Sequence, residues 1–107
     1  MKTEEGNKVK IMIVEPGKEP RAADIAPTLE AMQQVVGGYI EVVCPWADSV
    51  AIVCDEEGVL KGKPINRDIG NGLVIVGTFF VCGVGEEDLC GLTAKQAEKY
   101  GKLLAQQ

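Results

Sequence analysis

The sequence predicts an α+β domain in which a mixed, mainly antiparallel sheet of about five strands carries two helices on one face. Three observations support this class. Short runs of β-branched residues alternate with turn residues, two segments repeat apolar residues at helical spacing, and 107 residues suffice for one core. The expected order is strand, helix, four strands and helix (β-α-β-β-β-β-α). Residues 9–105 should form a single domain after a flexible N-terminus, residues 1–8.

The beginning of the chain predicts the first strand and the first helix. Residues 9–14 (VKIMIV) have the composition of a strand, and residues 15–20, with two prolines and a glycine, form a loop that could rim a pocket. A helix is expected over residues 25–36, with Asp24 as its N-cap and two glycines at its end. The first strand, this helix and the next strand could form a right-handed parallel crossover.

Two further strands are expected over residues 39–44 and 49–54, joined as a hairpin. Trp46, the only tryptophan, lies in the link between them and could either anchor a ligand or cover the edge of the core. An acidic turn over residues 55–58 (DEEG) then leads into a short strand over residues 59–61.

The longest apolar run, residues 73–81 (LVIVGTFFV), predicts the central strand of the sheet. It carries no charge and no proline, so it should be buried on both faces. A turn is expected before it at Asn71-Gly72, because both residues tolerate positive φ. Gly77 indicates a bulge or the close approach of another backbone or a ligand.

Residues 93–104 predict the last helix. Thr93 and Gln96 have the spacing of a capping box, in which each side chain bonds the backbone of the other residue. The apolar side of this helix, with Tyr100 at its centre, should be buried against the sheet.

The polar segment over residues 61–67 (KGKPINR) is the candidate ligand site. No Lys or Arg occurs between Ala22 and Leu60, whereas three occur within this segment. The guanidinium fork of Arg67 suits a phosphate or a carboxylate, and the amide of Asn66 could orient it. Alternatively, Arg67 pairs with surface carboxylates and Asn66 caps a turn. The expected ligand-binding residues are Asn66 and Arg67 as direct contacts, Gly77 and Thr78 as the floor, Lys61 and Lys63 as the rim, and Trp46 as an anchor.

Catalysis finds little support in the sequence, and we expect a non-enzymatic protein. The chain has no histidine, which excludes histidine catalysis and leaves a Ser or Cys nucleophile without its usual base. It has no phosphate-binding loop and no dinucleotide fingerprint. An enzyme that uses Glu41 or Asp68 as a base is the least supported hypothesis. The four cysteines contain no C-x-x-C pair, so we expect free thiols, no metal and no cofactor.

The net charge of −5 argues against a surface that binds nucleic-acid duplexes in general. No apolar run reaches the ~20 residues that cross a bilayer, and the N-terminus has no secretory signal, so a cytoplasmic location without membrane contact is expected. An acidic surface could instead bind a basic partner, as an inhibitor or a DNA mimic does. The carboxylates expected to face such a partner are Asp48, Asp55, Glu56 and Glu57.

Several stretches resemble the DUF3846 family, small domains of unknown function from phages, plasmids and bacteria of the Firmicutes type. They are VEPGKEP, TLEAMQQVVGGYIEVV, CDEEGVLKGKPINR and IVGTFFVCG, and the resemblance spans about residues 9–104. Asp55 stands where the family usually has Asn, a change that a turn tolerates. The resemblance carries over no catalytic residue. It implies an accessory or counter-defence role, in which the protein sequesters a nucleotide signal or blocks a host protein.

Two hypotheses follow from these observations. The first is a non-enzymatic protein that binds a small anionic, nucleotide-like ligand at residues 61–67, where a second copy of the chain completes the pocket in a homodimer. The second is an acidic module that binds a host protein, for which the affinity should fall steeply as salt is added.

Overall fold

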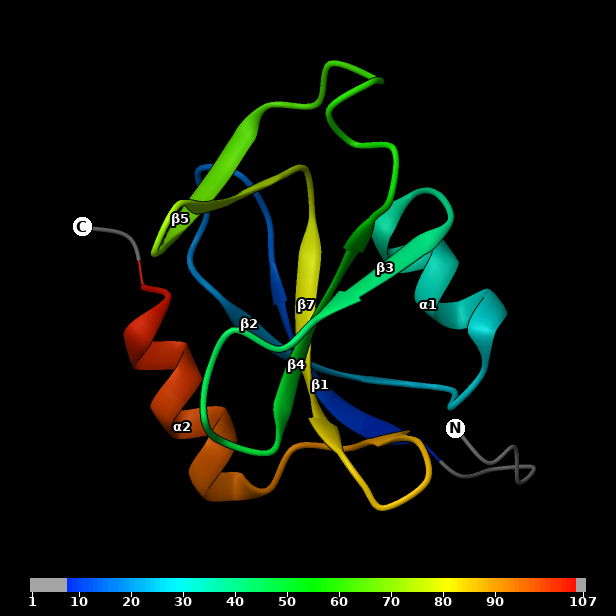
Figure 1. Cartoon of the computed structure of the whole chain (residues 1–107). Coiled ribbons are helices and arrows are strands. Elements are labelled where there is room, and N and C mark those ends of the chain that lie inside the picture. Colours follow the sequence, from blue (N-terminus) through cyan, green and yellow to red (C-terminus); the bar gives the residue numbers. More distant parts are fainter. Residues whose placement is uncertain (1–7, 106–107) are drawn as a thin grey trace.

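The computed structural model describes residues 8–105 and consists of a twisted antiparallel sheet, a separate two-stranded sheet and two helices (Figure 1). The main sheet has the order β2-β1-β7-β4-β3, and β8 pairs with β7 beyond the end of β1. The elements are β1 (Val9–Val14), β2 (Arg21–Ile25), α1 (Leu29–Val36), β3 (Ile40–Val43), β4 (Val50–Asp55), β5 (Ile65–Gly70), β6 (Leu73–Val76), β7 (Phe79–Val84), β8 (Leu89–Cys90) and α2 (Ala94–Leu103). The α+β class and the mainly antiparallel sheet are therefore confirmed. The predicted flexible N-terminus lies outside the described residues, except for Lys8.

A strand that the sequence analysis missed changes the beginning of the chain. Residues 21–25 turn back and pair with β1 in antiparallel register, from Val9 opposite Ile25 to Ile13 opposite Arg21. The expected helix over residues 25–36 therefore begins only at Leu29, and its N-cap is Thr28, whose side chain accepts a hydrogen bond from the Ala31 N–H. The prediction of Asp24 as the N-cap was wrong.

The parallel crossover was also wrong. Two strands, β7 and β4, lie between β1 and β3, and every strand pairing among the described residues is antiparallel. Because β2 already returns the chain along β1, α1 starts from the end of a hairpin rather than from a strand that leads into a parallel neighbour.

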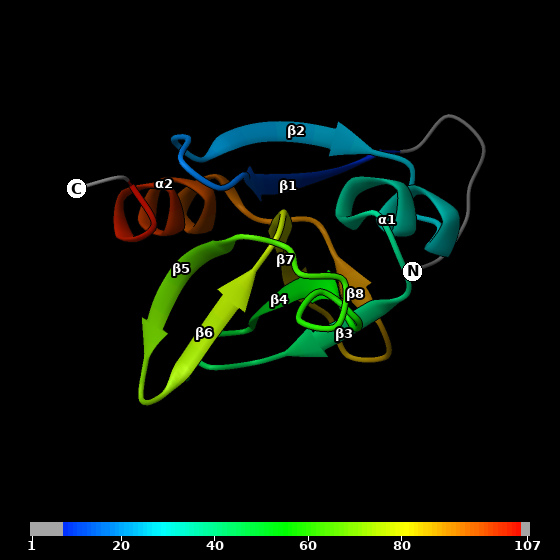
Figure 2. The same ribbon diagram turned by 90° about the horizontal axis from the view of Figure 1, so that it is seen from above.

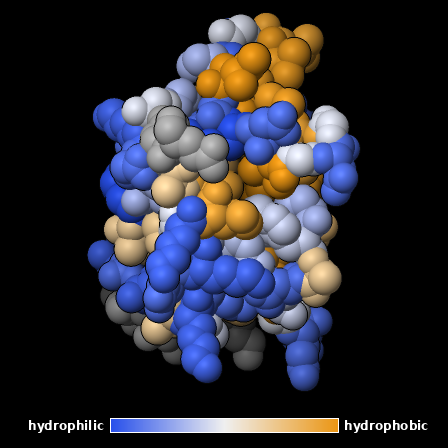
Figure 3. Space-filling view, turned by 90° about the vertical axis from the view of Figure 1, so that its left-hand side faces the viewer, coloured by the Kyte–Doolittle hydropathy of each residue, from blue (hydrophilic) through white to orange (hydrophobic). Residues whose placement is uncertain are grey.

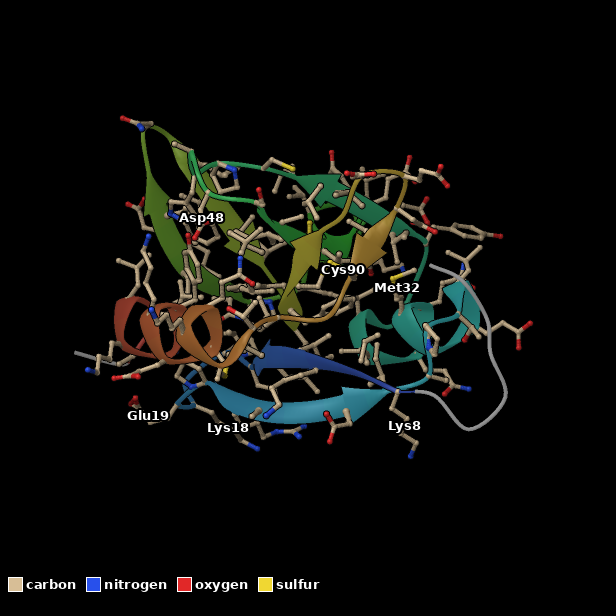
Figure 4. All side chains as sticks on the ribbon, turned by 90° about the horizontal axis from the view of Figure 1, so that it is seen from below. Lys8, Lys18, Glu19, Met32, Asp48 and Cys90 are labelled. Carbon is tan, nitrogen blue, oxygen red and sulfur yellow. The ribbon has the colours of Figure 1, made fainter. Side chains whose placement is uncertain are left out.

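The two helices cover opposite faces of the main sheet, whereas the sequence analysis placed them on one face (Figure 2). Neighbouring residues of a strand point to opposite faces, and Phe79 and Phe80 are both fully buried, so each face needs a covering layer. On one face α1 contributes Met32 and Val36; Met32 points from the helix into the interior (Figure 4). On the other face, α2 and the β5–β6 hairpin form the layer.

The predicted strand over residues 73–81 is divided in two at Gly77. The second part, β7, is buried on both faces as expected, but the first part, β6, leaves the main sheet and pairs with β5. Gly77 makes this break with a φ of 72°. The turn at Asn71-Gly72 joins β5 and β6 with positive φ at both residues, as predicted. The predicted short strand over residues 59–61 is instead part of a turn region.

The last helix closes the fold as the sequence predicts. In α2 the Thr93 side chain accepts a hydrogen bond from the Gln96 N–H, and the Gln96 side chain accepts one from the Thr93 N–H. Tyr100 is buried with 1% of its surface exposed, and Leu104 is buried next to it. The capping box fixes the start of the helix and so directs these two residues onto the sheet.

Candidate functional site

Two of the predicted rim residues, Lys61 and Lys63, end helix α1 instead of facing an open site. The ammonium of Lys63 donates to the Val36 carbonyl (2.8 Å), and that of Lys61 donates to the Gly37 carbonyl (3.3 Å). Both also contact Asp55 Oδ2, at 2.6 Å from Lys63 and 2.9 Å from Lys61. Since α1 has no basic residue in its last turn, these lysines supply the positive charge that stabilises a helix C-terminus.

The carboxylate of Asp55 is the buried centre of this cluster, with none of its side-chain surface exposed. Burial alone would raise its pKa, but hydrogen bonds from Lys63, Lys61 and the Glu57 N–H outweigh that effect and lower the pKa to about 2. Asp55 is therefore ionised at neutral pH and fully engaged. It cannot present its charge to a basic partner, as the interaction hypothesis expected of it.

Asn66 and Arg67 lie side by side on β5 and hold three distant parts of the chain together. The amide of Asn66 donates to the carbonyls of Val14 and Gly77, both at 2.8 Å. The guanidinium of Arg67 donates from Nε to the Leu104 carbonyl (2.9 Å) and from Nη2 to the Lys18 carbonyl (2.6 Å). Its Nη1 donates to Asn66 as well. The pair thus joins β5 to the end of α2, the β1–β2 turn and the β6–β7 junction.

The predicted floor residues, Gly77 and Thr78, form the β6–β7 junction. The Gly77 N–H donates to the Pro64 carbonyl (2.8 Å), while its own carbonyl accepts from Asn66. A Cβ built on Gly77 would lie 2.6 Å from Cδ of Lys63. A group does approach this glycine closely, but it is the side chain of a lysine of the same chain and not the backbone or ligand that the sequence analysis expected. Thr78 is half-buried beside it.

Trp46 lies in another place, over helix α2. Its ring centre is 4.6 Å from that of Tyr100, and it packs against the core on the α2 side of the sheet. The Tyr100 hydroxyl donates to Asp48 Oδ2 (3.0 Å), and Figure 4 shows Asp48 over this helix. Hydrogen bonds from the Ser49 N–H and from Tyr100 lower the pKa of Asp48. The Trp46 ring covers the edge of the core, which is one of the two roles that the sequence left open.

The seven predicted ligand-binding residues therefore occupy two neighbouring clusters and one separate position. The clusters, Lys61-Lys63 at α1 and Asn66-Arg67 at α2, meet at Gly77, and Trp46 lies apart. Each cationic side chain of the set already donates to carbonyls of this chain. An anion at this place would have to replace bonds that hold the fold together.

A groove that the sequence analysis missed lies between the edge strand β3 and strand β6, and we call it the β3–β6 groove. Its lining includes Glu41 and Val43 of β3, Cys54 of β4, the turn residues Glu56 and Val59, and residues 73–76 of β6. Cys54 forms part of the floor, and burial, together with the charges of Glu41 and Asp55, raises the pKa of its thiol to about 11. The thiol is therefore neutral at physiological pH, so this part of the floor carries no charge.

Exposed apolar side chains surround this groove. Val59 is 78% exposed and Val74 44% exposed, and both line the groove. Leu60, which follows Val59, and Ile65, which pairs with Val76, are exposed to 85% and 73%. In Figure 3 apolar side chains gather at the upper end of the molecule, above a hydrophilic lower half. The signal in the sequence was Val59-Leu60 directly after an acidic turn, which the sequence analysis assigned to a strand.

The charges of the groove are negative. Glu41 and Glu56 are exposed, no lining residue is Lys or Arg, and within residues 8–105 neither carboxylate forms an ion pair. Of the acidic residues predicted to face a partner, Asp55 and Glu56 line the groove, and the carboxylate of Asp55 is already paired with two lysines. Asp48 precedes β4 and Glu56 follows it, so the strand separates them by about 20 Å. The predicted acidic set does not form one face.

The described residues hold no group of three or more side chains that could bind a metal ion, and their four cysteines are free. Cys44 and Cys90 are exposed, while Cys54 and Cys82 are buried. Burial raises the pKa of the Cys82 thiol to about 12, and the neighbouring Cys90 and Cys44 add to the effect. The two buried thiols pack as small apolar side chains.

The chain belongs to the DUF3846 family: the sequence model of this domain of unknown function matches residues 9–105. No curated protein and no solved structure matches the chain. Among the described residues, no helix has the length and apolar content needed to span a bilayer.

Proposed function

We propose that this domain is a protein-interaction module whose β3–β6 groove binds a segment of a partner protein that carries basic and apolar side chains. One observation carries the proposal: the groove combines exposed apolar walls with two carboxylates, Glu41 and Glu56, that have no cationic partner within residues 8–105. Apolar side chains of a partner would be buried there, while its Lys or Arg residues would select the register.

The setting implied by the family resemblance agrees with such a module. A small accessory protein of a phage or another mobile element can block a host protein through one surface, and this needs no catalytic group. The net charge of −5 would speed its encounter with a basic target. The proposed role is therefore that of an inhibitor, with a counter-defence target as the biological setting.

Selection from a phage-displayed library of random 12-residue peptides tests the proposal. Peptides with Lys or Arg next to apolar residues should be enriched on the wild-type protein, and their affinity should fall as salt is added. The double variant Glu41→Lys/Glu56→Lys should lose them. Its control is Glu86→Lys/Glu87→Lys in the exposed β7–β8 loop, which changes the net charge equally, from −5 to −1. Equal binding by both variants, or no enrichment of basic peptides, would contradict the proposal.

A small anionic, nucleotide-like ligand is the second candidate. It is favoured by the excess of cationic charge at Asp55, where two ammonium groups share one carboxylate and Lys61 is 39% exposed. A thermal-shift screen against nucleotides, cyclic nucleotides and ADP-ribose tests it, because a ligand that binds only the folded state raises the melting temperature. A shift that Lys61→Ala removes would favour this candidate over the groove. A screen without any shift would exclude these ligands. Sedimentation of the protein with and without a ligand that gives a shift would test for a homodimer.

A further inference from the structure

The unpaired edge of β3 borders the β3–β6 groove and offers backbone groups to a partner. β3 is the last strand of the main sheet and pairs only with β4. The Glu56 N–H donates to the Tyr39 carbonyl (2.8 Å), which fixes the phase of the ladder. Since hydrogen-bonded pairs alternate in an antiparallel ladder, Glu41 and Val43 bond to β4, and the backbone N–H and C=O groups of Ile40 and Val42 point away from it.

The side chains of β3 connect this edge to the groove. Glu41 and Val43 point to the groove face and line it, whereas Ile40 and Val42 point to the α1 face. In Figure 2, β3 and the β5–β6 hairpin lie on the same side of the molecule. A strand laid along β3 would therefore send every second side chain into the groove.

The opposite edge of the sheet lacks this combination. There, β2 pairs with β1, and the groove lining includes no residue of β2. The Leu92 N–H donates to the Lys10 carbonyl, so the backbone groups of Lys10 and, two residues on, of Met12 face away from β2. Their cross-strand neighbours, Asp24 and Ala22, therefore hold the outward backbone groups of that edge. The two edges thus offer the same backbone groups but different surroundings.

A second copy of the chain fits the β3 edge poorly. Antiparallel pairing of two β3 strands centred on Glu41 would place the two Glu41 carboxylates opposite each other, and like charges in that position are destabilising. Each copy also brings a net charge of −5. A charged residue on a four-residue edge strand is a recognised device against self-pairing. A basic segment meets no such repulsion.

We infer that the partner segment binds as an added strand along β3, with a basic residue beside Glu41 and an apolar residue two positions away beside Val43. This mode of binding rests on the interaction function proposed above and specifies how the groove is used. Main-chain hydrogen bonds to Ile40 and Val42 would give affinity, and the alternating side chains would give specificity. The partner is thus an extended segment with a period of two, not a helix or a folded surface.

The variant Val42→Pro tests this mode. The Val42 N–H points outward, so proline removes a donor from the edge without breaking a bond to β4, and edge strands tolerate proline at such positions. Ala22→Pro makes the same change at the opposite edge and serves as the matched control. Peptides enriched on the wild-type protein should bind Val42→Pro about ten-fold more weakly and Ala22→Pro with unchanged affinity.

A second measurement keeps the test decisive if Val42→Pro unfolds. Peptides methylated at alternate backbone nitrogens should lose binding in one of the two phases only, because only every second N–H of an added strand faces β3. Strand addition would be overturned if neither Val42→Pro nor methylation in either phase changed the affinity while Glu41→Lys/Glu56→Lys abolished binding. The proposed interaction function would remain in that case. If Glu41→Lys/Glu56→Lys also left the affinity unchanged, both strand addition and the interaction function would be overturned. A wild-type dimer that Val42→Pro converts into monomers would show that the edge belongs to a second copy.

Discussion

Asp55 Oδ2 lies 2.6 Å from the ammonium of Lys63, and the same ammonium donates to the Val36 carbonyl at the end of α1. One lysine therefore connects the end of β4, the end of α1 and the segment that leads into β5. Its stem also passes over Gly77, where a Cβ would meet it. This arrangement explains why a polar, cationic segment packs against the end of α1: its charges satisfy groups that the helix and the sheet leave without partners.

Because Asp55 is charged in the folded protein, the free energy of unfolding should fall as the solution is made acidic. Its pKa is about 2 in the folded protein against 3.8 for the free group, so its stabilisation is complete above pH 4 and is lost as the pH falls from about 4 to 2. The loss should be on the order of 2 kcal/mol. Asp55→Asn should lower the free energy of unfolding by about 3 kcal/mol at pH 7, because two lysines then lack their carboxylate.

Urea unfolding at several pH values, followed by Trp46 fluorescence, measures this effect. The difference between the wild-type protein and Asp55→Asn should shrink as the pH is lowered from 7 to 2.5. A difference that stays constant would show that Asp55 is not held as a paired carboxylate.

Arg67 should be a stability residue. Its side chain donates to the Leu104 and Lys18 carbonyls and to Asn66, so Arg67→Ala should lower the free energy of unfolding by about 2–4 kcal/mol. Arg67→Lys should recover less than half of this loss, since an ammonium cannot reproduce the planar fork.

The control for Arg67 is Lys18→Ala. Arg67 uses only the backbone carbonyl of Lys18, and the side chain of Lys18 is 69% exposed, so this variant should unfold within about 0.5 kcal/mol of the wild-type protein. If Arg67→Ala and Lys18→Ala were equally stable in urea, Arg67 would not be needed for stability, and its guanidinium would again be a candidate for binding a ligand.

Local patterns in the sequence predicted the features that local chemistry determines. The capping box of α2, the turn at Asn71-Gly72 and the two-sided burial of residues 79–81 depend on residues close in the chain, and all three are confirmed. The missed strand β2 is a largely exposed edge strand whose two charged residues, Arg21 and Asp24, point to opposite faces, so its sequence shows no clear alternation.

The role of residues 61–67 could not be predicted in this way. The Asn66 amide bonds the carbonyl of Val14, 52 positions away, and Arg67 bonds that of Leu104, 37 positions away. Every residue has a backbone carbonyl, so the sequence gives no sign of which one will accept. The β3–β6 groove depends on the same long-range arrangement, because it forms only where the β5–β6 hairpin folds over the end of the main sheet.

Gly77 should tolerate a side chain less well than the other glycines with positive φ. Gly77→Ala meets two penalties, the unfavourable φ of 72° and a contact of 2.6 Å with Cδ of Lys63. Gly72→Ala meets only the first, because its φ is 82° and no atom lies within 4 Å of its Cβ position. We expect a loss of about 1 kcal/mol for Gly72→Ala and about 2–3 kcal/mol for Gly77→Ala.

Thermal and urea unfolding of the two alanine variants provide the comparison. Lys63→Ala removes the Cδ atom that a Cβ at position 77 would meet, but it also removes the ion pair with Asp55, so this variant is measured alone as well. The loss of stability caused by Gly77→Ala should be smaller in the Lys63→Ala background than in the wild-type protein. Equal losses for Gly77→Ala and Gly72→Ala would mean that the lysine stem moves aside at no cost.

Tyr100 should reverse its contribution to stability at high pH. It is buried, and burial together with the hydrogen bond to Asp48 raises the pKa of its hydroxyl from 10 to about 12. A raised pKa means that the folded state resists ionisation, so stability is intact below pH 10 and falls as the pH rises towards 12, by about 2 kcal/mol at pH 11.5. Tyr100→Phe keeps the ring against Trp46 and lacks this titration.

At pH 8 the Tyr100→Phe variant should be less stable than the wild-type protein by about 1 kcal/mol, the contribution of the lost hydrogen bond. At pH 11.5 it should be the more stable of the two by about 1 kcal/mol, and urea unfolding at both pH values measures the change of sign. If the wild-type protein keeps its advantage at pH 11.5, the hydroxyl ionises in place and the bond to Asp48 does not hold it protonated.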